Sequence, residues 1–163
     1  MSNHSLFLMN AAKYGEINTL RQWVERNGEP IPSMVLANAA GRGHMECVRY
    51  LLPLVPQKAI DEGLIHASIE GKMAIAQLLT GYCSDTNTFN VSAFHACINN
   101  RADIFSILYS LCDPDNVQHR LQQLQFDEHH PQAQLFYERH RQEQLRQTLI
   151  TEVGVHPTRT AKM

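Results

Sequence analysis

The sequence predicts an all-α fold: a solenoid of about four helical pairs, closed by a C-terminal capping helix. Three observations carry this prediction: four segments align without gaps, they share one turn residue, and apolar residues recur at helical spacing around it. The aligned segments are LMNAAKYGEINTLRQWV (8–24), LANAAGRGHMECVRYLL (36–52), LIHASIEGKMAIAQLLT (64–80) and AFHACINNRADIFSILY (93–109).

The shared turn residues, called anchors below, are predicted to end the first helix of each pair. They are Gly15, Gly43, Gly71 and Asn100, spaced 28, 28 and 29 residues apart. Glycine and asparagine tolerate a positive φ better than other residues, and helices commonly end on a residue in that conformation. Each anchor is therefore expected to adopt the left-handed conformation.

Apolar and small residues flank each anchor at constant distances. Two, five and eight residues after the anchor, apolar residues form one stripe along the second helix of each pair: Ile17, Leu20 and Trp23; Met45, Val48 and Leu51; Met73, Ala76 and Leu79; Ala102, Phe105 and Leu108. Small residues stand four and three before it: Ala11 and Ala12; Ala39 and Ala40; Ala67 and Ser68; Ala96 and Cys97. A pair cannot bury such a stripe alone, so the pairs are expected to stack.

The C-terminal third departs from the repeat. Asp113 followed by Pro114 predicts a helix start, with Val117, Leu121 and Leu124 on one face, which amounts to half a repeat. Pro131 is expected to open a long polar helix that ends near Ile150, with a solvated middle over 138–144 and apolar residues only towards its ends. Those apolar residues are Leu135, Phe136, Leu145, Leu149 and Ile150.

This helix has two interpretations: it covers the end of the stack, or it projects and pairs with a partner or with its own copy. The predicted organisation is a repeat stack over 1–126, the C-terminal helix over 127–151 and a mobile tail over 152–163.

Composition narrows the function. The 163 residues, 44% hydrophobic and 18% charged, suit one globular domain, and the net charge of −2 makes nucleic acid a poor partner. No export signal or membrane-length apolar run is visible. The four cysteines form no CxxC pair and fall in apolar patterns, as expected for reduced thiols in the cytoplasm.

The stretch GHMECVRYLL (43–52), with Ala39 and Ala40 before it, resembles the ankyrin repeat from its inter-helix glycine through its second helix. The resemblance covers roughly residues 5–112. Ankyrin repeats are longer, at 33 residues, and open with Thr-Pro-Leu-His, which is missing here. The absent residues fall where ankyrin repeats carry their β-hairpin fingers, so plain loops are expected at 28–32, 53–57 and 82–88. The 34-residue tetratricopeptide pattern fits less well.

The resemblance implies a non-catalytic adaptor that binds a protein partner on the concave face of its first helices. In ankyrin proteins, the variable residues just before the glycine line that face. The corresponding residues are Lys13 and Tyr14; Gly41 and Arg42; Ile69 and Glu70; Ile98 and Asn99. Tyrosine and arginine often dominate binding energy at interfaces. The two isoleucines could instead help to close the packing between helices.

A polar column, five residues before each anchor, consists of Asn10, Asn38, His66 and His95. We expect it to be structural and to satisfy loop amides, because buried polar groups need partners. A zinc site would need a further ligand, since stacked helices lie about 8–10 Å apart. The same spacing argues against a Cys83–Cys112 disulfide.

Other chemistry finds little support. His129 and His130, with His140, form a weak candidate metal cluster, and no nucleophile, base and orienting group assemble into a known motif. We therefore expect no enzyme activity, cofactor or metal. Three alternatives stay open: a self-associating adaptor built through 131–150, a bacterial host-directed effector or regulator, and an enzyme component that uses His66 or His95.

Overall fold

The computed structural model describes residues 3–28, 30–124 and 133–153, and within these ranges the chain is all-α, without a β-strand. The helices are α1 (Asn3–Tyr14), α2 (Ile17–Asn27), α3 (Ser33–Arg42), α4 (Met45–Leu51), η1 (Leu52–Leu54), α5 (Gln57–Glu70), α6 (Met73–Thr80), α7 (Thr86–Ile98), α8 (Ala102–Tyr109), α9 (Pro114–Gln123) and α10 (Ala133–Val153). The prediction of an all-α fold is confirmed.

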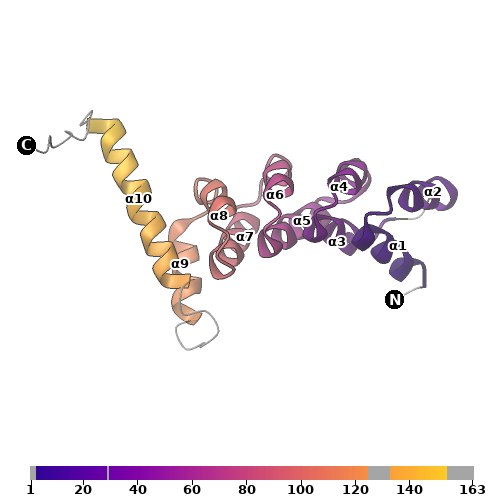
Figure 1. Ribbon diagram of the computed structural model, residues 1–163, viewed down its shortest axis with the longest axis horizontal. Helices are drawn as coiled ribbons and strands as arrows, with labels where there is room; N and C mark the ends of the chain where they lie inside the picture. Colours follow the sequence, from indigo (N-terminus) through magenta and orange to yellow (C-terminus); the bar gives the residue numbers. More distant parts are fainter. Residues whose placement is uncertain (1–2, 29, 125–132, 154–163) are drawn as a thin grey trace, which may run out of the picture.

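The helices lie in two rows (Figure 1). The first helices of successive pairs, α1, α3, α5, α7 and then α9, pack against one another in chain order. Each second helix packs on the first helix of its own pair, and α2 also contacts α4 while α6 contacts α8. The N-terminus lies at one end of this arrangement and α10 at the other.

All four anchors adopt the expected conformation. Gly15, Gly43, Gly71 and Asn100 have φ values of 74°, 89°, 71° and 56°. In every pair the backbone amide of the residue after the anchor donates to the carbonyl oxygen of the alanine that stands four residues before the anchor, at 2.8–3.0 Å. This hydrogen bond closes a Schellman turn, which satisfies a carbonyl group that the helix end leaves free.

The repeated apolar and small positions form the core. The small residues four and three before the anchor are at most 3% exposed, and the stripe positions five and eight after it are at most 9% exposed. The position two residues after the anchor is less buried than predicted. Ile17, Met45 and Met73 are half-buried and Ala102 is exposed, because this position lies in the first turn of the second helix, at the margin of the core.

Two of the three expected loops contain helical structure. In the segment 53–57, Pro53 and Leu54 belong to the short 3-10 helix η1, and Gln57 already begins α5. In the segment 82–88, α7 begins at Thr86, because the Asp85 carboxylate accepts hydrogen bonds from the amides of Asn87 and Thr88. The segment 28–32 is free of helix at its described residues.

The C-terminal region follows the prediction in outline. Asp113 caps α9 by accepting from the amides of Asp115 and Asn116, and Val117 and Leu121 are buried. The helix α10 extends to Val153, three residues past the expected end, and Pro131 and the segment 154–163 lie outside the described residues.

The middle of α10 is not fully solvated, which corrects the prediction for 138–144. His140, Arg141 and Gln144 are half-buried, and Tyr137 is completely buried. The first half of α10 therefore covers the end of the helical rows. Beyond it, Leu145 and Leu149 are 56% and 60% exposed, on the part of α10 that extends away from the other helices in Figure 1.

Candidate functional site

The candidate surface follows the C-terminal ends of the first helices. Tyr14, Arg42, Glu70 and Asn99, one residue before each anchor, form what we call the face column. Tyr14 is 66% exposed, Arg42 and Glu70 are exposed, and Asn99 is half-buried. Because the first helices pack in chain order, the column presents an aromatic, a basic, an acidic and an amide side chain in succession.

The residues one position earlier are less accessible. Lys13, Ile69 and Ile98 are half-buried, and Gly41 is buried. Ile98 packs against the core, so it takes part in closing the helix packing. A Cβ atom at Gly41 would lie 3.5 Å from the Cβ of His66 and 3.6 Å from the Cγ of Glu70, so this glycine permits close approach of α3 and α5.

The charged groups of the face column are available to a partner. Within the described residues the sole ion pair joins Lys58 to Glu62, at 4.0 Å, so neither Arg42 nor Glu70 has an ionic partner there. The Lys13 ammonium lies 5.7 Å from the centre of the Tyr14 ring, which places a positive charge next to the exposed aromatic side chain.

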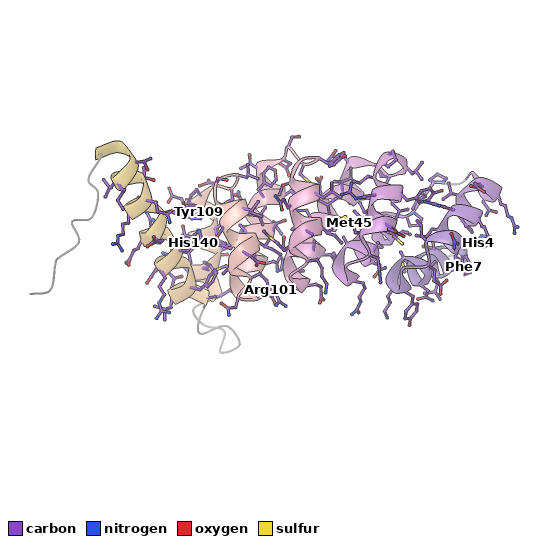
Figure 2. The ribbon with its side chains drawn as sticks, turned by 45° about the horizontal axis from the view of Figure 1, so that its top comes forward. His4, Phe7, Met45, Arg101, Tyr109 and His140 are labelled. Carbon is purple, nitrogen blue, oxygen red and sulfur yellow. The ribbon has the colours of Figure 1, made fainter. Side chains whose placement is uncertain are left out.

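The residues one position after the anchor in the later pairs, His44, Lys72 and Arg101, form what we call the basic ladder. They lie next to the helix ends that carry the face column. His44 Nε2 donates to the carbonyl oxygen of Lys13 at 2.9 Å, and Arg101 Nε donates to that of Ile69 at 3.4 Å. The aliphatic stem of Lys72 lies against Gly43, 3.4 Å from the position of a Cβ atom there. His44 and Arg101 thus each cover the C-terminal end of the preceding first helix, and the guanidinium of Arg101 adds a positive charge where cations are favourable. Figure 2 labels Arg101 among these residues.

Sequence reasoning missed this ladder, although its signal was present. The residue after the anchor is Glu16 in the first pair and then His44, Lys72 and Arg101, so it is basic wherever another pair precedes it. The pattern carries meaning only once the pairs are known to pack in chain order.

The polar column occupies equivalent positions but does not make the expected bonds. Asn10 is exposed, while Asn38, His66 and His95 are half-buried, and none of the four side chains hydrogen-bonds to a described residue. Burial lowers the pKa of His95, and the charges of His66 and Arg120 lower it further.

No group of three potential metal ligands comes together among the residues that the structure describes. His129 and His130 lie outside those residues. His140 belongs to a cluster with Phe105, Tyr109, Phe136 and Tyr137, its ring centre 4.9 Å from that of Phe105 and 5.3 Å from that of Tyr109. Burial lowers the pKa of His140.

Phe105 is the centre of this aromatic cluster, with ring contacts to the other four members. Tyr137 is its most buried member from α10, and the sequence interpretation did not single it out. Its ring is fully buried, and its hydroxyl donates to the carbonyl oxygen of Pro114 at 2.8 Å. It thereby attaches α10 to the start of α9.

The cysteines are free thiols in the described structure. Burial raises the pKa of Cys83 and of Cys97 to about 12 and that of Cys112 to about 11. Since the thiolate is the reactive form, these residues act as core side chains.

Comparison with protein-family models and with curated proteins finds no match to this chain. The resemblance to ankyrin repeats therefore rests on the residues of the chain itself. Among the described helices, none combines the length and the apolar character needed to span a membrane.

Proposed function

We propose that this chain is a protein-binding adaptor, a short ankyrin-like solenoid whose first-helix face takes a protein partner in the cytoplasm. The face column carries the proposal: Tyr14, Arg42 and Glu70 are exposed at one repeated position, on helices that pack in chain order. A tyrosine and an arginine on a rigid surface are the residue types that most often dominate binding energy.

The rigidity of this face supports the proposal. The Schellman turns fix the chain directly after each face residue, and the basic ladder holds the helix ends on which those residues stand. A partner would meet side chains on an ordered backbone, which lowers the entropy lost on binding.

The test is affinity capture from native lysate, followed by mass spectrometry, with the wild type, Y14A/R42A and a matched control. The control is E46A/Q77A, which changes two exposed residues of the second helices α4 and α6. We expect the wild type and the control to capture the same proteins and the face variant to lose them. All three should melt within about 2 °C of one another, because exposed substitutions change stability by at most about 0.5 kcal/mol. If Y14A/R42A captures the same proteins as the wild type, the face column does not bind the partner.

A second candidate function, self-association through α10, follows from the exposed side chains of Leu145, Leu149 and Ile150. Leu145 and Leu149 stand one helical turn apart and make a short apolar seam. Removing the helix is a poor test, since Tyr137 is buried in the core. Sedimentation of the full chain against L145S/L149S is better: a dimer that the double variant abolishes supports this function, and a monomer in both contradicts it.

A further inference from the structure

The N-terminal end of the stack contains a hollow of about 300 Å³ between α1 and α2. Its lining residues are Phe7, Thr19, Gln22, Trp23, Arg26 and Asn27. Phe7 is 50% exposed, and the neighbouring Leu6 is 52% exposed. The hollow lies at the opposite end of the molecule from α10, and Figure 2 shows Phe7 there, far from His140.

The repeat itself shows what this space accepts. Eight residues before the anchor stand Phe7, Val35, Gly63 and Ser92, and the last three are buried. A Cβ atom at Gly63 would lie 3.4 Å from Leu36, a residue of the preceding pair. At Gly63, therefore, the aliphatic side chain of Leu36 packs on this position, whereas Phe7 in the first pair is half exposed.

The rim of the hollow differs from its internal copies. Cys47, Ile75 and Ile104 are buried at the position where the first pair has Thr19. Tyr50, Leu78 and Ile107 stand where it has Gln22. Arg26 also lines the rim, and it makes no hydrogen bond or ion pair with a described residue. The space thus combines an aromatic wall with an unpaired cation and polar side chains.

Another helical pair of the same kind is not the fitting occupant. In later pairs the residue after the anchor is basic, and in two of them, at His44 and Arg101, it donates to a carbonyl oxygen at the end of the preceding first helix. The first pair has Glu16 at this position. If another helical pair packed in front of it, the Glu16 carboxylate would face the carbonyl oxygens at the end of that pair's first helix, which carry the negative end of the helix dipole.

We infer that this hollow binds the carboxyl-terminal residue of a polypeptide with an aliphatic last side chain. The aliphatic group would pack against Phe7 and Trp23, and the terminal carboxylate would pair with Arg26. Trp23 and Arg26 are three residues apart on α2, so their Cβ atoms lie about 5–6 Å apart. One residue that carries both groups spans that distance, whereas side chains of adjacent residues in an extended peptide point to opposite sides.

Trp23 is the sole tryptophan of the sequence, so intrinsic fluorescence reports on this hollow directly. The probes are N-acetyl-leucine, N-acetyl-leucinamide and the amide of N-acetyl-leucyl-aspartate, titrated at constant pH and ionic strength. Free N-acetyltryptophanamide serves as the control for non-specific quenching. For ligands of this size we expect N-acetyl-leucine to saturate in the low millimolar range.

The carboxylate should improve binding about threefold over the amide, as for an exposed ion pair. R26Q should remove this preference. F7A should weaken the binding of N-acetyl-leucine and of its amide to the same extent. R139Q, an exposed arginine of α10, is the matched control and should keep the preference. A signal that saturates with none of the probes, or a preference that survives in R26Q, overturns the inference. Tighter binding of the aspartate probe than of N-acetyl-leucine overturns the assignment to a chain terminus.

Discussion

The imidazole of His44 reaches across the boundary between two helical pairs and donates from Nε2 to the carbonyl oxygen of Lys13, at 2.9 Å. The same ring covers Gly15, where a Cβ atom would lie 2.5 Å from Nδ1. One side chain thus caps the end of α1 and requires a glycine beneath it. Arg101 repeats both features at Ile69 and Gly71.

We expect H44A to lower the free energy of unfolding by about 1 kcal/mol, because it removes a hydrogen bond from a helix end that the bond covers. Urea unfolding of the wild type and H44A measures the difference. H119A serves as the control, since His119 is exposed on α9, and it should stay within about 0.5 kcal/mol of the wild type. If H44A lowers the free energy of unfolding no more than H119A does, the basic ladder does not stabilise the fold.

Gly15 and Gly28 both have positive φ values, of 74° and 59°, but only Gly15 is covered. A Cβ atom at Gly28 meets nothing within 4 Å, so G28A should cost about 1 kcal/mol for the left-handed backbone alone. G15A should cost about 1 kcal/mol more, since it also displaces His44. Denaturation midpoints of the two variants test this order. Equal losses of stability in G15A and G28A would show that the contact between Gly15 and His44 does not affect stability.

Tyr137 attaches α10 to the stack through both its ring and its hydroxyl. Y137F should lose about 1 kcal/mol with the hydrogen bond to the carbonyl of Pro114, whereas Y137A should lose about 3–5 kcal/mol with the buried ring. Tyr82 is 53% exposed, so Y82A provides the control. If Y137A is no less stable than Y82A, α10 does not pack on the stack as described.

Acid should destabilise the fold through its half-buried histidines. Burial lowers the pKa of His140 and of His95 below the ordinary value of 6.5. The unfolded chain therefore takes up these protons more readily than the folded chain. The stability that depends on the neutral rings is fully present above pH 6.5 and declines as the pH falls towards the folded-state pKa values.

The measurement is the free energy of unfolding at pH 7.5 and at pH 5.5. We expect it to be lower at pH 5.5, and the decrease should be smaller in H95Q/H140Q than in the wild type. H119Q should show the wild-type decrease. A double variant with an undiminished decrease would assign the pH dependence to other groups.

Much of the fold could be predicted because the same turn conformation and the same burial pattern recur in all four pairs. The positive φ of Asn100 was foreseeable since three glycines hold the same position, and the burial of Ala39 or Leu51 followed from recurrence alone. Local capping chemistry also identified Asp113 and Pro114 as the start of α9.

Features that depend on one contact between distant segments were not predictable in this way. Tyr137 and His140 stand in a polar stretch, and their burial depends on the aromatic surface that Phe105 and Tyr109 offer from α8. Similarly, the early start of α7 depends on the Asp85 cap, whose signal was hidden in a polar loop. For the candidate site, the sequence indicated exposure both one and two residues before each anchor. Tyr14, Arg42 and Glu70 are exposed, but the residues one position earlier are half-buried or buried, because they pack between neighbouring first helices. The basic ladder was not predicted.

The proposal that the first-helix face binds a protein is tested most directly by an affinity measurement on the captured partner. The purified partner is titrated against the wild type, Y14A/R42A and E46A/Q77A, and the dissociation constants are compared. Loss of a tyrosine and an arginine anchor, each contributing at least about 1 kcal/mol, predicts a weakening of roughly 30-fold or more in the face variant alone. Equal dissociation constants for all three proteins would contradict binding on this face.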